Sequence, residues 1–323
     1  MVQVSGWRFE QAQAVWFCVG AIALCLGAAW GTPQRRIDPR PWAALAAFVL
    51  TLCLWHHPDQ TLGPAQGYFH LFVLLAAALY VLCGVLAVWV IATYATAALL
   101  PWLFLPVVVL TLLAPKTPTG WLWTPSQTAF VLALAVPLLW GRARWLIPIM
   151  VWQILTLRSY SSLVALGVAG VALLWLARRW AWAVAGTGAL ALWCAVSAPA
   201  LLAKFAIRTE TWPMTWREWQ TAFWFGHGPE TGLLSPMIQT SQGYAYRHQD
   251  LLAGLRDFGV FLLLPLGWCA WHLWRGATLA QRYVLLVMGL VMGVQTQVCF
   301  PRVMVYGCAL LGWCLMREDS CSA

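Results

Sequence analysis

Long apolar runs separated by short polar connections make up most of the chain. A helix that crosses the ~30 Å hydrocarbon core of a membrane needs roughly 20 mainly apolar residues, and runs of about that length recur along the whole sequence. The pattern predicts an all-α polytopic membrane protein with about eleven transmembrane helices. The expected helices lie near residues 12–31, 41–56, 68–91, 93–114, 126–140, 145–158, 161–177, 180–203, 251–274, 283–300 and 303–316.

Composition supports this class and excludes several others. Apolar residues make up 62% of the 323 residues and charged residues 9%, which leaves too little polar surface for a water-soluble globule or a disordered chain. The net charge of +9 is spread in ones and twos between the apolar runs, so we expect no dense basic face for nucleic acid. Nine of the ten cysteines lie within apolar runs, which predicts packing residues and not a disulfide framework.

The basic residues of the short connections set the expected orientation, because cytoplasmic loops are enriched in Lys and Arg. With the N-terminus outside, the inner connections and the C-terminal tail collect ten Arg residues, whereas the short outer connections and the N-terminus hold four basic residues. The one long connection, residues 204–250, is then expected on the outer side. The sequence therefore divides into helices one to eight at 1–203, an outer loop at 204–250, and helices nine to eleven with a short cytoplasmic tail at 251–323.

The loop at 204–250 concentrates polar side chains on the expected outer side. It contains four basic residues, two His and four acidic residues. Its Trp residues, from Trp212 to Trp224, follow a helical spacing that predicts a helix with one apolar face at the membrane interface. A glycine-rich turn follows at 226–229, and His248 stands at the start of the next apolar helix. Polarity of this kind on one side of a membrane protein predicts a functional site.

The loop carries three short motifs whose order and spacing resemble those of the O-antigen ligase and polymerase (Wzy-type) superfamily. The motifs are Arg208-x-x-x-Trp212, then Gly226-x-Gly228-Pro229, then a segment from His248 through Leu252 and Leu255 to Gly259. Any one of them is a weak signal, but their combination on one side of the membrane is fairly specific.

Two segments upstream of the loop are also similar to this family. Residues 120–137 resemble a family stretch in which Gln127 takes the place of the usual Asn, and residues 157–162 resemble a helix start that contains Arg158. The resemblance covers roughly residues 115–275.

This resemblance implies a fold, a location and an activity. The family forms a GT-C-like bundle of helices in the inner (cytoplasmic) membrane of bacteria, with its active site on the periplasmic side. Its members transfer a glycan from an undecaprenyl-diphosphate carrier to an acceptor hydroxyl on a glycan, a lipid or a protein. Ligation to an acceptor and polymerisation of repeat units are both open, and a non-catalytic membrane scaffold or a transporter is the alternative class.

The chemistry of a lipid-diphosphate leaving group suggests roles for the matching residues. Negative charge develops on the phosphates as the glycan leaves, and Arg208 is the first candidate to bind them because its planar guanidinium stays protonated. His248 is the candidate general base for the acceptor hydroxyl. The carboxylates of the loop stand singly, so no metal site and no cofactor is expected, and His227 is interpreted as loop filler. We expect substrate contacts from Gln127, Arg158, Trp212, Gly226, Gly228 and Arg247.

Overall fold

Helices dominate the part of the chain that the computed structural model describes. The described residues are 38–55, 82, 85, 104, 107–109, 125–140, 144–227, 237–240, 243–246, 249–294 and 301–315. The helices within them are α2 (Arg40–Trp55), α5 (Pro125–Trp140), α6 (Leu146–Thr156), α7 (Tyr160–Leu176), α8 (Trp180–Val196), α9 (Ala198–Thr221), α10 (Asp250–Phe258), the 3₁₀ turn η1 (Val260–Leu262), α11 (Leu263–Arg275), α12 (Leu279–Met292) and α13 (Pro301–Leu315).

The mostly helical class is confirmed, and the number of membrane spans stays a prediction. α2, α5, α6, α7 and α13 each lie within a few residues of an expected helix. The expected spans at 12–31, 68–91 and 93–114 fall outside the described residues, apart from a few helical positions. Within the described ranges no single helix is both long and apolar enough to cross a bilayer, and α10 with η1 and α11 meets that standard only as a pair bent by 116°.

One short hairpin departs from the expectation of an all-α chain. β1 (Met237–Thr240) pairs antiparallel with β2 (Gly243–Tyr246), and Ile238 lies opposite Ala245. Both strands fall inside the expected outer loop. Strand pairing depends on contacts between two segments, which the hydrophobic period of one four-residue segment does not reveal.

Two expected boundaries also differ from the structure. The expected helix at 180–203 ends at Val196, and α9 then begins at Ala198 and continues to Thr221, across the expected start of the loop at residue 204. The expected helix at 251–274 is broken at Gly259, whose φ of +72° is a left-handed conformation that does not continue a right-handed helix.

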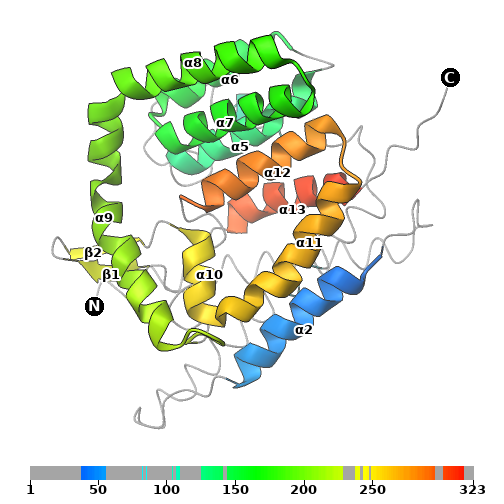
Figure 1. Ribbon diagram of the computed structural model, residues 1–323, viewed down its shortest axis with the longest axis vertical. Coiled ribbons are helices and arrows are strands. Elements are labelled where there is room, and N and C mark those ends of the chain that lie inside the picture. The colour runs from blue at the N-terminus through cyan, green and yellow to red at the C-terminus, as the bar shows by residue number, and fades with distance from the viewer. Residues whose placement is uncertain are drawn as a thin grey trace. The chain divides into compact units, whose positions relative to one another are not determined.

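The described residues divide into two compact units, and α9 contributes to both. In the unit formed by Thr96–Thr209 and Ala277–Gln295, α7 packs against α8 on one side and α12 on the other, and α5 packs against α6 and α12 (Figure 1). Small residues allow α7 and α8 to approach closely, because Gly167 faces Leu190 and Gly186 faces Val171.

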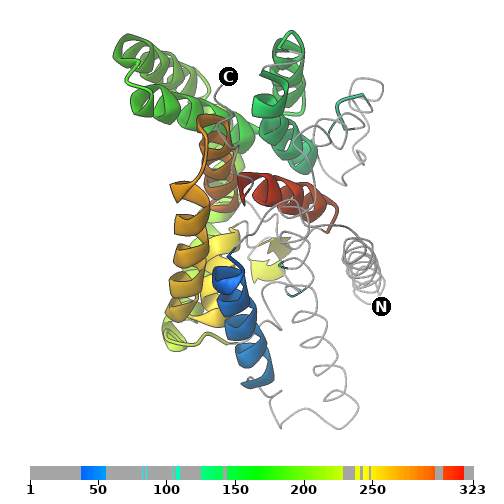
Figure 2. The ribbon, with the colours of Figure 1, turned by 90° about the vertical axis from the view of Figure 1, so that its right-hand side faces the viewer.

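The other unit contains Met1–Ala95, Glu210–Gly276 and Thr296–Ala323. Here α11 lies along α2, as two perpendicular views show (Figures 1 and 2). Val49 of α2 joins Phe258 and Leu262 in one hydrophobic cluster. A second cluster forms where the C-terminal part of α9 packs on α10, and it contains Trp219, Leu252 and Leu255 with Trp212 and Val260 beside them.

Candidate functional site

The glycine turn after α9 and the end of α10 are packed backbone against backbone. Gly226 and Gly259 both have a φ of +72°. Gly226 lies against the backbone of Asp257, and Gly259 lies against the backbone of Trp224. A Cβ atom at either glycine would overlap the opposing main chain, so neither position accepts a side chain without a rearrangement.

Backbone hydrogen bonds hold this glycine interlock together. The His227 amide donates to the Arg256 carbonyl oxygen at 2.8 Å, and the Val260 amide donates to the Phe223 carbonyl oxygen at 2.9 Å. The Gly226 amide donates to the Ala222 carbonyl oxygen just beyond α9, and the Gly259 amide donates to the Leu255 carbonyl oxygen of α10. The interlock therefore joins Gly226 of the second sequence motif to Gly259 of the third, although a long stretch of sequence separates them.

An ionic cluster lies at the end of α10, next to the interlock. Arg256 Nε donates to Glu218 Oε2 at 2.8 Å, and Arg256 Nη1 donates to Asp257 Oδ1 at 3.0 Å. The side chain of Asp257 is completely buried and that of Arg256 is nearly so. Arg256 compensates the charge of the buried Asp257 carboxylate. Its bond to Glu218 ties the end of α10 to α9.

Arg256 and Asp257 were not predicted as site residues from the sequence. They are adjacent charges in the otherwise apolar segment 251–262, and that contrast was the available signal. Their roles depend on Glu218, which lies far away in the sequence, so the pairing itself was not visible.

His227 closes the C-terminal end of α9, so its interpretation as loop filler is wrong. Its Nε2 atom lies 2.7 Å from the Glu218 carbonyl oxygen and 2.8 Å from Thr221 Oγ1. A carbonyl oxygen only accepts, so Nε2 carries the proton and donates to it. The last carbonyls of a helix lack partners within the helix, and His227 satisfies one of them.

Arg208 lies on α9 and is buried, with 7% of its surface exposed. Its guanidinium carbon lies 4.3 Å from the centre of the Phe205 ring, a cation–π contact. Its Nε has no hydrogen-bond partner, and no carboxylate pairs with the guanidinium in the described part of the chain. Burial lowers the pKa of Arg208 from its usual value. A guanidinium still retains its proton at neutral pH, so this position suits an anionic ligand.

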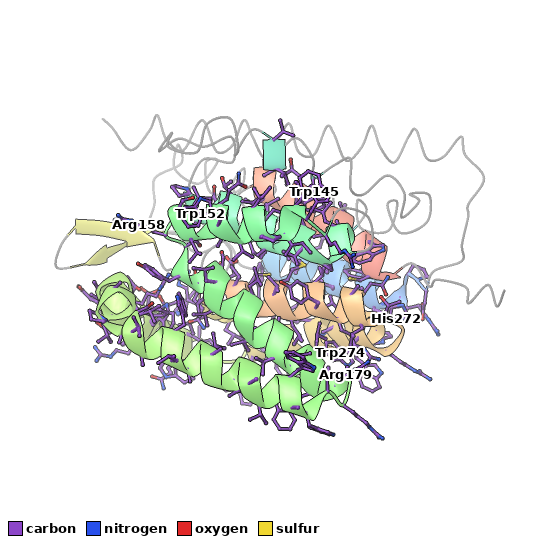
Figure 3. The ribbon with its side chains drawn as sticks, turned by 90° about the horizontal axis from the view of Figure 1, so that it is seen from above. Trp145, Trp152, Arg158, Arg179, His272 and Trp274 are labelled. Atoms are coloured by element: carbon purple, nitrogen blue, oxygen red, sulfur yellow. The ribbon has the colours of Figure 1, made fainter. Side chains whose placement is uncertain are left out.

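Arg158 is exposed at the turn between α6 and α7. Its φ of 51° is left-handed, and the Ser159 amide donates to the Ile154 carbonyl oxygen at 3.4 Å, as in a helix ending of the Schellman type. Arg158 and Arg179 lie at opposite ends of α7 (Figure 3). The assignment of Arg158 to the outer side and of Arg179 to the inner side stays a prediction.

The structure does not link the three candidates of this unit directly. Gln127 is buried on α5 and Arg208 is buried on α9, whereas Arg158 is exposed. Among the described residues no hydrogen bond or ion pair joins Gln127, Arg158 and Arg208. Their grouping at one reaction centre stays a prediction.

Trp212 lies within packing and not on an open face. It is partly buried against the cluster of Trp219, Leu252 and Leu255. Trp216 is exposed on α9, and Trp224 is exposed beyond the end of that helix. The expected single stripe of Trp residues is therefore split between a packed side and an exposed side.

The remaining predicted site residues, Gly228, Arg247 and His248, lie outside the described residues. The helix expected after His248 is present as α10, which begins at Asp250. Asp250 in its first turn is favourable at the positive end of the helix dipole.

Comparison with other proteins adds no relative. No protein-family model, no curated protein and no solved structure matches the chain. In the part of the chain that the structure describes, no three His, Cys, Asp or Glu residues are placed to hold a metal ion.

Proposed function

We propose that the chain is a membrane glycosyltransferase of the O-antigen ligase type. It transfers a glycan from an undecaprenyl-diphosphate carrier to an acceptor hydroxyl at the periplasmic face of a bacterial inner membrane. The observation that carries the proposal is Arg208, a buried cation with no carboxylate partner among the described residues. The glycine interlock supports it, because it packs the segment around Gly226 against the segment around Gly259, and these glycines belong to two motifs of the resemblance.

The proposed reaction places most of its charge change on the diphosphate. The acceptor oxygen attacks the anomeric carbon, the bond from that carbon to the phosphate oxygen breaks, and the carrier diphosphate leaves with the bonding electrons. Arg208 binds these oxygens through its planar fork, in a place where water is excluded and the interaction is strong. Arg158 supplies a second cation on the same side of the membrane.

The acceptor hydroxyl must lose a proton as the new bond forms. His248 takes this proton, since a neutral imidazole accepts at the pH of the periplasm. Gly226, Gly228 and Arg247 belong to the same segment and contact the substrate, while Gln127 and Trp212 shape its surroundings. The charges in this mechanism come from side chains, so it requires no metal ion or cofactor.

The surface of α8 supports a location in the membrane. This helix packs on α7, and Ala183 is its one fully buried residue. Trp182, Leu192 and Val196 each expose more than two thirds of their surface. Large apolar patches of this kind are unfavourable in water and favourable in lipid. The proposal therefore keeps the bundle of about eleven transmembrane helices, with the acceptor, the carrier and the bilayer as partners.

Transfer by the purified full-length protein tests the proposal. With a carrier-linked glycan and an acceptor in detergent, Arg208→Lys and Arg208→Gln should lower transfer by ~100-fold or more, because a single charge-stabilising donor is often worth that much. Arg217→Gln is the matched control, an exposed Arg on the same helix, and should keep its rate. Transfer should also persist in EDTA. Equal rates in the Arg208 and Arg217 variants would contradict the proposal.

Ligase and polymerase are separated by the length of the glycan products. In a strain that lacks this protein, a gel should show no ladder of repeat lengths if the chain is a polymerase. An intact ladder that stays on the carrier and never reaches its acceptor indicates a ligase. An unchanged glycan pattern would indicate a non-catalytic scaffold or a transporter.

A further inference from the structure

Five aromatic residues gather around the turn that follows α9 and the 3₁₀ turn η1, and we refer to them as the aromatic shelf. Neighbouring rings contact one another: Phe223 meets Trp224 with ring centres 5.0 Å apart, and Phe261 meets Trp224 at 5.5 Å and Phe225 at 5.3 Å. Trp216 completes the shelf through the buried ring of Trp219. Trp224 exposes 58% of its surface, and Trp216, Phe223 and Phe225 are also exposed.

The shelf is held rigidly even though four of its five rings are exposed. The Phe223 carbonyl oxygen accepts hydrogen bonds from the Val260 amide and from Trp219 Nε1. Gly259 packs against the backbone of Trp224. The aromatic rings are therefore presented outward by a fixed turn, which is an unfavourable arrangement in water.

Polarity changes from one side of the shelf to the other. On α9, just before the shelf, the exposed side chains include Arg217, Gln220 and Thr221. On α11, just after it, the exposed side chains are apolar until Arg275 at the far end of the helix, and they include Leu264 and Trp271. The shelf thus lies where a polar surface meets an apolar one, which is the position that Trp and other aromatic residues favour at a membrane interface.

The bend between α10 and α11 also indicates a position at the membrane interface. The two helices meet at a bend of 116° (Figure 1). α10 carries Asp250, Arg256 and Asp257 within nine residues, and the Glu218 partner of Arg256 is 36% exposed, so this cluster suits the polar interface better than the hydrocarbon region. If α11 runs across the bilayer, a bend of this size places α10 close to the membrane plane.

We propose that the aromatic shelf lies in the boundary between lipid headgroups and acyl chains, with α10 in the interface and α11 entering the hydrocarbon. The occupant of the shelf is the lipid itself, because the shelf is continuous with the apolar exposed side of α11. This inference rests on the proposed membrane location but not on glycan transfer. It places Gly226 and Arg256 at headgroup depth, where a carrier lipid presents its diphosphate.

A photoreactive side chain tests the depth directly. The full-length protein, with Trp224→p-benzoylphenylalanine, Leu264→p-benzoylphenylalanine or Gln220→p-benzoylphenylalanine, is reconstituted in vesicles of phosphatidylethanolamine and phosphatidylglycerol and irradiated. Mass spectrometry of the labelled peptides should show phospholipid adducts at residues 224 and 264, several-fold above those at residue 220. The same substitution at Phe225, which is also exposed, repeats the test if the Trp224 variant does not fold.

The three positions separate the two proposals. The shelf proposal is overturned, and the membrane location stands, if residue 264 forms phospholipid adducts while residues 224 and 225 form no more than residue 220. Residue-220 levels at all of these positions overturn the membrane location as well. Adducts as expected in a protein that transfers no glycan support the shelf and count against the transferase alone.

Discussion

Gly226 and Gly259 each pack against the main chain of residues that lie next to the other glycine. Gly226 contacts the backbone of Asp257, two residues before Gly259, and Gly259 contacts the backbone of Trp224, two residues before Gly226. The packing is reciprocal, and both glycines have the same left-handed φ. This relationship gives a physical reason for glycine at both positions that does not depend on any ligand.

Alanine at either glycine should destabilise the protein strongly. The left-handed backbone alone costs a side chain about 1–3 kcal/mol, and overlap with the opposing main chain adds to it. Gly170→Ala on α7 is the control, because a Cβ there meets nothing within 4 Å. That change should be neutral or should stabilise by up to roughly 1 kcal/mol. Denaturant unfolding in detergent gives the comparison, and equal stability in the Gly226 and Gly170 variants would exclude the interlock.

The ionic cluster should be sensitive to the loss of its cation. Arg256→Met leaves the buried carboxylate of Asp257 without its guanidinium partner, and should lower the free energy of unfolding by ~3–5 kcal/mol. Glu218→Gln should cost roughly 1 kcal/mol or less, because that carboxylate is partly exposed. The exposed Arg217→Met serves as the control. If the Arg256 and Arg217 variants unfold at the same denaturant concentration, Arg256 does not tie α10 to α9.

The sequence predicted the positions of the packed helices well and the site geometry poorly. Long apolar runs marked α2, α5, α7 and α13 because burial of apolar side chains dominates in those segments. The apolar run also predicted one helix through Gly259, because hydropathy carries no information about a left-handed φ. The polar part of α9 was assigned to the outer loop, where the Trp spacing predicted a helix at the membrane interface, yet Thr211 and Thr215 are buried along it.

The side-chain contacts of the site depend on residues far apart in the sequence. The motifs singled out Gly226 and Gly259, and the structure packs each of them against the main chain beside the other. The partnership of Arg256 with Glu218 and the bond from His227 to the Glu218 carbonyl appear only when α9 and α10 pack together. A pattern in one segment carries no information about such a partner.

Arg158 and Arg178 provide a matched pair for separating a backbone role from substrate binding. Both are exposed, and both have the left-handed φ of a helix ending, 51° and 55°. Glycine relieves this conformation, so Arg158→Gly and Arg178→Gly should each stabilise the protein by roughly 1 kcal/mol. Only Arg158→Gly should reduce glycan transfer, since Arg178 is expected on the cytoplasmic side. Equal transfer by the two variants would remove Arg158 from the proposed diphosphate site.

His248 and His227 are expected to respond differently to substitution by Gln. As the general base, His248 must be neutral, so transfer by the wild-type protein should fall on acidification, because the imidazole then gains its second proton. His248→Gln should lower the rate strongly and remove this acidic limb, because an amide does not take up the proton. His227→Gln should preserve both, since its amide nitrogen replaces Nε2 as the donor to the Glu218 carbonyl oxygen. The shorter His227→Asn loses that bond and should be less stable. Rates measured across pH for the purified variants check these outcomes. A wild-type rate in His248→Gln, or loss of the acidic limb in His227→Gln, would show that His248 is not the general base.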